Sequence, residues 1–208
     1  MKQALVIGGA SENGRVILDT LLENNFKIVN VGSSVYEHDD VTNIKINWND
    51  IDIEFVQKCF SKFDTTFDFV FFNQNSSSLN KDDYSVDHDD ILEVWKRVKD
   101  WSNSHWLSCQ LPFLILHTIR NNLCADSKVG WMLSGYMDYT NPGSMDHTDY
   151  SSFKYFNYLS MKSFGTVNEF KTFGIYPTFT DRLHGQEKLK NIINDIVNNR
   201  SIESEFKF

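Results

Sequence analysis

Tyr150 and Lys154 have the residue types and the spacing to move a proton. Their separation in the sequence puts both side chains on one face of a helix, one turn apart. The ammonium group favours the phenolate and lowers the pKa of the tyrosine, which can then exchange a proton with a substrate oxygen near neutral pH. An ordinary tyrosine on a helix surface is the alternative explanation for Tyr150.

A second pair, Tyr158 and Lys162, has the same spacing. It is the weaker candidate because Lys162 leaves little helix before the strand that we predict to end at Tyr176. Lys154 leaves about four helical turns before that strand. We therefore assign the proton chemistry to Tyr150 and Lys154.

A glycine-rich turn follows the first apolar run of the chain and precedes a helical pattern. Glycine permits close approach of the backbone, and the start of a helix favours a pyrophosphate through its free N–H groups. The candidate phosphate-binding residues are Gly8, Ser11, Glu12, Asn13 and Gly14. A turn that serves only to pack the helix is the alternative.

Composition limits the classes of partner. The chain has 208 residues, of which 41% are hydrophobic, and this is enough for one domain with a sizeable core. The formal net charge of -8 would repel a nucleic acid. A dinucleotide remains compatible, because backbone N–H groups can hold its phosphates without a net positive charge. We expect a small-molecule ligand and no nucleic-acid partner.

The remaining sequence signals indicate a cytoplasmic protein without a metal site. Cys59, Cys109 and Cys124 show no CxxC spacing, which favours reduced thiols. The first apolar run is too short for a signal peptide, and no later stretch approaches a membrane span. Two clusters of histidine and aspartate, at 38–40 and 88–90, are interpreted as solvated loop charge, because no metal-ligand spacing accompanies them.

Strand and helix patterns alternate along the whole chain. Strands are predicted at 4–7, 27–31, 43–46, 67–72, 129–133 and 173–176, with a closing edge strand within 202–208. Helices are predicted at 14–24, 53–63, 91–122, 150–170 and 186–199. The long third helix should bend or break near Pro112, because proline removes a helix hydrogen bond. This alternation predicts a single α/β domain over residues 1–208 with a doubly wound, mostly parallel sheet of the Rossmann type, whose ligands bind at the carboxyl ends of the strands.

Two segments resemble the short-chain dehydrogenase/reductases: ALVIGGASENGRVI at residues 4–17 and YSSFK at residues 150–154. Gly8 and Gly14 match the first and third glycines of the family's turn, and Ser11 and Arg15 match common neighbours. Glu12 stands in place of the middle glycine. A carboxylate beside a phosphate is unfavourable unless it turns to solvent or pairs with a cation. The doubled glycine and the short chain are most similar to the dihydropteridine reductases within this family.

The resemblance implies an NAD(P)-dependent oxidoreductase that reduces a small carbonyl or imine substrate. Tyr150 would supply the proton, Lys154 would lower its pKa and hold the nicotinamide ribose, and Ser134 would orient the substrate. The family's helix asparagine would fall at Asn103, although the register also allows Ser102. An ordinary serine at the end of a strand is the alternative for Ser134.

The resemblance also implies further cofactor contacts. Asn47, Asn73, Pro177 and Thr178 match positions that line the dinucleotide in the family, and ordinary loop polarity is the alternative for each. After the second predicted strand the chain has Ser33 and Ser34 where an acidic residue would select NAD. Hydroxyl and backbone donors fit a 2′-phosphate better than a carboxylate does, so we expect NADP, with NAD possible.

Two expectations concern the whole protein. Apolar stretches near 106–119 and 155–170 match the helices that form the family's interface, which predicts a homodimer or homotetramer, although core packing would also explain them. The alternative to an enzyme is a non-catalytic sensor or scaffold that binds a dinucleotide. It is motivated by Glu12 and by the altered motifs around Asn73 and Thr178.

Overall fold

The structure is a computed structural model. It describes residues 1–74, 95, 99, 102–103, 105–134, 148–168, 170–177, 182–200 and 204–207. In this part of the chain, no helix combines the length and the apolar character needed to cross a membrane.

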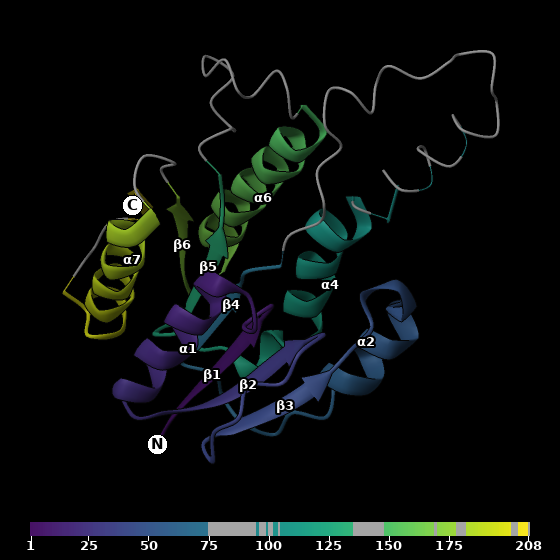
Figure 1. Ribbon diagram of the computed structural model, residues 1–208. Helices are drawn as coiled ribbons and strands as arrows, with labels where there is room; N and C mark the ends of the chain where they lie inside the picture. The colour runs from purple at the N-terminus through teal and green to yellow at the C-terminus, as the bar shows by residue number, and fades with distance from the viewer. Residues whose placement is uncertain are drawn as a thin grey trace.

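A seven-stranded sheet forms the centre of the molecule (Figure 1). Its strands are β1 (Lys2–Ile7), β2 (Phe26–Gly32), β3 (Val41–Lys45), β4 (Phe69–Phe72), β5 (Lys128–Met132), β6 (Lys171–Tyr176) and β7 (Glu205–Lys207). All neighbouring strands are parallel, in the order β3-β2-β1-β4-β5-β6-β7. The predicted doubly wound sheet is confirmed, and the strand order reverses between β1 and β4, where such folds bind ligands.

Helices cover both faces of the sheet. They are α1 (Glu12–Glu23), α2 (Ile53–Phe60), α4 (Leu111–Thr118), α6 (Thr148–Val167) and α7 (Arg182–Val197), with short 3-10 turns η1 (Trp48–Asp50) and η4 (Arg120–Asn122). Helices α1 and α7 pack together on one face, and α2, α4 and α6 cover the other (Figure 1). This three-layer arrangement buries the inner strands β1, β4 and β5 on both sides, which explains their apolar sequences.

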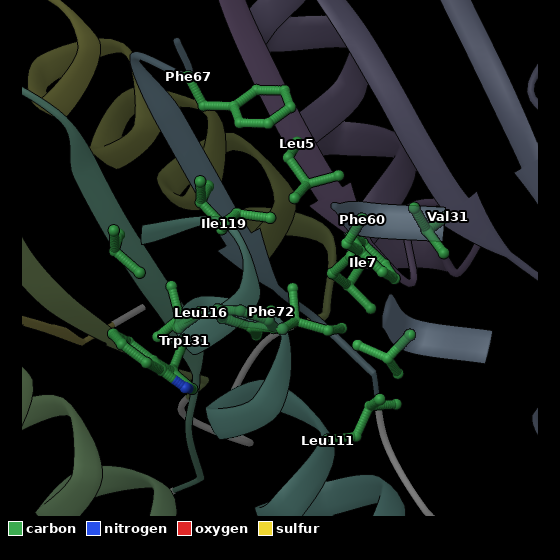
Figure 2. Close-up of a cluster of buried hydrophobic side chains, with 14 of the residues drawn as sticks. Leu5, Ile7, Val31, Phe60, Phe67, Phe72, Leu111, Leu116, Ile119 and Trp131 are labelled. Carbon is green, nitrogen blue, oxygen red and sulfur yellow. The ribbon is translucent and has the colours of Figure 1, made fainter. Parts of the chain in front are cut away.

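Alternate residues of β1 pack into two separate hydrophobic cores. Leu5 and Ile7 belong to the cluster under α2, α4 and α6, whereas Ala4 and Val6 belong to the cluster under α1 and α7. Figure 2 shows the first cluster, in which Leu5 lies near Phe67, while Ile7 is the strand partner of Phe72 in β4. Phe72 stacks on Trp131 of β5, with 5.4 Å between the ring centroids. The central strand is thus anchored from both sides, and its carboxyl end is a rigid base for the turn that follows.

A π-helical segment, η3 (Trp106–Gln110), runs directly into α4. The N–H of Leu111 donates to the carbonyl of Trp106, the wider spacing typical of this helix type. Pro112 follows at the start of α4 and has no N–H to continue the ladder. The predicted irregularity near Pro112 therefore takes the form of a widened turn just before the proline.

Candidate functional site

The turn after β1 requires glycine at two positions. Gly8 has a φ of +83°, and a Cβ there would lie 2.9 Å from the backbone nitrogen of Gln74. A Cβ on Gly14 would lie 2.6 Å from the carbonyl oxygen of Gly8, because α1 begins directly against the turn. Both glycines therefore bring backbone segments closer than any side chain would allow, and the turn packs directly against β4 and the start of α1.

The same turn is tied to β4 by Asn73, which is 3% exposed. Its Nδ2 donates to Ser11 Oγ at 2.7 Å and to the carbonyl of Gly8 at 3.0 Å. Ser11 is the N-cap of α1 and its Oγ accepts from the N–H of Gly14 at 3.2 Å. Three predicted cofactor-binding positions, Gly8, Ser11 and Asn73, are thus brought together in one hydrogen-bonded unit.

Glu12 turns toward α7. Its Oε1 accepts a hydrogen bond from Gln186 Nε2 at 2.9 Å, and the side chain is exposed. Neither Glu12 nor the half-buried Asn13 lines the pocket described next. The carboxylate that replaces the family's middle glycine is therefore held by an amide on a neighbouring helix.

A pocket of about 340 Å³ opens where β1, β2 and β4 end. Five predicted cofactor-binding residues line it: Gly8, Ser11, Ser33, Ser34 and Asn73. Ala10, Gly32, Trp48 and Gln74 complete the lining. None of these described residues is acidic, so the pocket has no carboxylate to repel a phosphate.

The loop that carries Ser33 and Ser34 is held by two polar contacts. Asn43 of β3 exchanges hydrogen bonds with the backbone of Tyr36, both at 2.9 Å. The hydroxyl of Tyr36 donates to Asp19 of α1, and this bond raises the pKa of Tyr36 to about 12. The two exposed serines therefore stand at the pocket rim on a loop fixed between β3 and α1.

Sequence reasoning did not identify Trp48 or Gln74 as site residues. Trp48 lies in η1, next to the predicted Asn47, and packs half-buried against the core. Asn47 itself is exposed, donates to Asp50 at 2.7 Å and does not line the pocket. Proximity to Asn47 was the available signal for Trp48. For Gln74 the signal was its place beside Asn73.

Lys154 lies at the carboxyl end of β5, where the reaction is expected. The side chain is 2% exposed, and Nζ donates to the carbonyl of Met132 at 2.8 Å. Burial lowers the pKa of Lys154 to about 8. Ser134, two residues beyond the strand, is also buried. Tyr150 is in α6 one turn before Lys154, and its side chain lies outside the described residues.

The helix opposite Lys154 presents a thiol. Cys109 of η3 is 1% exposed, and its Sγ donates to the carbonyl of Phe153 at 3.7 Å. Burial raises the pKa of Cys109 to about 12, so the thiol is neutral at pH 7. Asn103, the position matched to the family's asparagine, is exposed at a point before η3.

Two further predicted positions follow β6. Pro177 comes directly after the strand and is half-buried. Thr178 lies outside the described residues. The register of the strand agrees with the prediction that this segment reaches the carboxyl edge of the sheet, on the same side as Lys154.

The alternative pair, Tyr158 and Lys162, contacts the last strand of the sheet. Lys162 lies 2.5 Å from Glu205 of β7, and Tyr158 donates to the same carboxylate at 3.5 Å. Tyr176 of β6 donates to its other oxygen at 3.2 Å. These four side chains, which we call the β7 clasp, hold the last strand against α6 and β6.

Comparison with known proteins shows which solved structures share this fold. No protein-family model matches the chain, and no curated protein matches it by sequence. Solved structures match over nearly the full length. A short-chain dehydrogenase/reductase (glucose/ribitol dehydrogenase) from Brucella melitensis has a TM-score of 0.74 at 11% identity, with 99% of this chain and 93% of that chain covered.

Two other similar structures contain cofactors. A carbonyl reductase from Pseudomonas aeruginosa PAO1, in complex with NADP, has a TM-score of 0.71 at 12% identity over 99% of this chain and 94% of that one. An oxidoreductase of the short-chain dehydrogenase/reductase family from Brucella ovis, with a partially ordered NAD, has a TM-score of 0.72 at 11% identity over 99% and 98%. The chain therefore has the fold of the short-chain dehydrogenase/reductases, as its two motifs predicted.

Proposed function

We propose that this protein, which has the short-chain dehydrogenase/reductase fold, is an NAD(P)-dependent oxidoreductase that reduces a small carbonyl or imine substrate. The observation that supports this most is the hydrogen-bonded unit of Gly8, Ser11 and Asn73 at the β1–α1 turn. It stands at the strand-order reversal, where parallel sheets bind dinucleotides.

The residues present fit a dinucleotide. Gly8 and Gly14 let the turn pack closely against β4 and the start of α1, and a pyrophosphate would bind at the N-terminus of this helix. The pocket lined by Ser33, Ser34 and Trp48 would take the adenosine half, with the indole as an apolar wall. When bound, the nicotinamide supplies the hydride.

We further propose that NADP is preferred over NAD. The lining residues described at the end of β2 are Gly32, Ser33 and Ser34, with no acidic group to bind the ribose hydroxyls and to exclude a phosphate. The exposed serine hydroxyls can donate to a 2′-phosphate. Carbonyl reductase from Pseudomonas aeruginosa PAO1 is a structural neighbour with NADP bound.

Three residues of this chain would take part in proton transfer to the substrate. Lys154, with its pKa near 8, is still mostly protonated at pH 7 and would favour the phenolate of Tyr150 one helical turn away. Tyr150 would donate its proton to the substrate oxygen or nitrogen as reduction proceeds. Ser134, buried at the end of β5, would donate to the same substrate atom and orient it.

Titration of the protein with NADPH and NADH, followed by assay across a panel of carbonyl and imine compounds, tests the proposal. The wild type should bind NADPH more tightly than NADH. Tyr150→Phe should keep the Kd for NADPH but lose at least about 100-fold in turnover. Tyr155→Phe, an exposed tyrosine on the same helix, is the matched control and should remain active.

Two results would decide against the enzyme. Unchanged turnover of Tyr150→Phe would refute the catalytic assignment. Binding of NADPH without turnover of any compound would favour the alternative of a dinucleotide-binding sensor or scaffold.

We also propose that two copies associate through α4 and α6. Phe113, Phe156 and Leu159 are 54%, 43% and 48% exposed, and Val167 is 75% exposed. Together with neighbouring residues they border an apolar groove of about 490 Å³ between the two helices. An exposed apolar surface of this kind is typical of a protein interface.

A further inference from the structure

The connection from β2 to β3 is short for two parallel strands. It consists of residues 33–40, all of which the structure describes, and these residues form no helix. A crossover between parallel strands usually takes about a dozen residues or more and contains a helix. Here Tyr36 packs against the core under α1 and α7. Because the connection has no helical hydrogen bonds of its own, side chains have to hold its backbone.

Asn43 of β3 holds the connection through the backbone of Tyr36. Its Oδ1 accepts from the N–H of Tyr36, and its Nδ2 donates to the carbonyl of Tyr36, both at 2.9 Å. An N–H can only donate and a carbonyl can only accept, so the two bonds together fix the orientation of the Asn43 amide. The bond from the Tyr36 hydroxyl to Asp19 holds the side chain of the same residue.

Asn30 links Asn43 to the glycine-rich turn. The two asparagines are direct partners in the β2–β3 register, and Asn30 Nδ2 donates to Asn43 Oδ1 at 2.9 Å. Asn30 is fully buried, and a Cβ on Gly9 would lie 2.5 Å from its Oδ1. The second glycine of the turn thus makes room for Asn30. A buried amide costs more free energy than an aliphatic side chain in the middle of a strand, which points to a role beyond packing.

Asn30 and Asn43, which we call the asparagine clamp, connect two walls of the pocket. The glycine-rich turn forms one wall, and residues 32–34 form the other. Gly32 is fixed by its pairing with β3, and Tyr36 is fixed by the clamp. Only three residues lie between these two fixed points. The serines at the pocket rim are therefore held in place before a ligand binds.

We infer that Asn43 is a positioning residue that sets the preference for NADP, because it holds Ser33 and Ser34 where a 2′-phosphate would bind. The inference rests on the proposed function and its cofactor preference. A loop that is already ordered loses less conformational entropy when it binds a ligand. NAD has no phosphate at this position, so the fixed serines strengthen the binding of NADP more than that of NAD.

The test is calorimetric measurement of Kd for NADPH and for NADH with the wild type and with Asn43→Ala. Binding of NADPH should weaken about tenfold, the cost of ordering one residue, while the Kd for NADH should stay within about twofold. General damage to the fold would weaken both nucleotides alike. The ratio of the two Kd values therefore separates positioning from a merely structural role.

Asn122→Ala is the matched control. Asn122 also makes two hydrogen bonds to the backbone, from its Nδ2 to the carbonyls of Phe63 and Thr65 at 2.9 and 2.8 Å. Its own carbonyl accepts from the N–H of Phe67 just before β4 begins, at the edge of the sheet opposite the pocket. This variant should bind both nucleotides as the wild type does.

Amide hydrogen exchange in the free wild type is a second test that needs no variant. The N–H of Tyr36 donates to Asn43 and should be protected before any nucleotide is added. Rapid exchange at Tyr36 that slows only on addition of NADPH would overturn the inference, since the loop would then be ordered by the ligand. A folded Asn43→Ala variant that keeps the wild-type ratio of the two Kd values would overturn it as well.

These outcomes differ from failure of the proposed function. A wild type that binds NADPH and NADH equally would overturn the inference together with the cofactor preference, but it would leave the oxidoreductase intact. Failure of the oxidoreductase itself would appear as a wild type that binds neither nucleotide.

Discussion

Lys154 is a buried cation, and its environment disfavours the charged form. Burial lowers its pKa from 10.5 to about 8, which corresponds to an energetic cost of about 3 kcal/mol for the charged form. The hydrogen bond to Met132 offsets only part of this cost. A residue retained at such a position is expected to serve the reaction rather than the fold.

Replacement of Lys154 by Met should therefore abolish turnover and raise the free energy of unfolding by about 1 kcal/mol at pH 7. Because the folded pKa lies below the unfolded one, the unfolded chain binds the proton more strongly between pH 8 and 10.5. As the pH increases across that range, the free energy of unfolding of the wild type should rise relative to that of the variant. Urea unfolding at pH 7.5 and pH 10 measures this difference.

Lys171→Met is the control for that comparison, because Lys171 is largely exposed. Its stability difference from the wild type should be nearly constant over the same pH range. A Lys154→Met variant whose difference is equally constant would show that the buried lysine does not titrate as its surroundings suggest.

At the residue scale, the sequence predicted side chains that act within a local motif. Gly8 and Ser11 were identified from the glycine-rich turn, and Asn73 from the resemblance to the family; the structure joins them through hydrogen bonds. Gln74 was missed as a pocket residue, because its contact with Leu107 arises only from the packing of η3.

Among the elements, β7 depends most on side-chain contacts for its position. It has only three residues and pairs with β6 alone. The β7 clasp adds Lys162, Tyr158 and Tyr176 around Glu205. The hydrogen bond from Lys162 is the main cause that lowers the pKa of Glu205 below its ordinary value of 4.5.

Substitution of Glu205 by Gln should loosen β7 and lower the free energy of unfolding by at most about 1 kcal/mol, since the pair is partly exposed. A depressed carboxyl pKa adds stability above the unfolded value, and that stability is lost as the pH falls through the folded pKa. Wild type and variant should therefore converge in acid. Amide hydrogen exchange at residues 205–207, measured from pH 7 to well below the ordinary carboxyl pKa of 4.5, follows this loss.

Asp126→Asn is a suitable comparison, because Asp126 and Lys171 form an exposed pair at 3.6 Å. It should leave exchange in β7 unchanged. Rapid exchange of β7 in the wild type at pH 7 would show that the clasp does not hold the strand.

The strands and helices were easier to predict from the sequence than the segments that connect them. Each predicted strand is present. The inner strands were the easiest to predict, because a strand buried on both faces has a continuous apolar sequence. The irregularity at Pro112 was expected from the chemistry of proline. Its π-helical form was not, because the choice between a kink and a widened turn depends on the helices and strands packed around it.

At the scale of the whole molecule, the exposed apolar face of α4 and α6 predicts a dimer. Leu159→Lys should place a charge in the groove between these helices and shift the protein to a monomer without unfolding it. Light scattering after size exclusion measures the mass. Ile53→Lys, on the exposed side of α2, is the control and should leave the mass unchanged. A wild type that is monomeric at micromolar concentration would refute the proposed association.

The bridge from Asn73 to the glycine turn has a consequence for synthesis on the ribosome. The turn and its helix are translated first, but the amide that fixes them arrives more than sixty residues later, with separations of 62 and 65 positions. Until β4 has left the exit tunnel and paired with β1, the nascent chain carries an incomplete phosphate cradle. The proposed nucleotide affinity should thus not appear before β4 has been synthesised and has inserted beside β1.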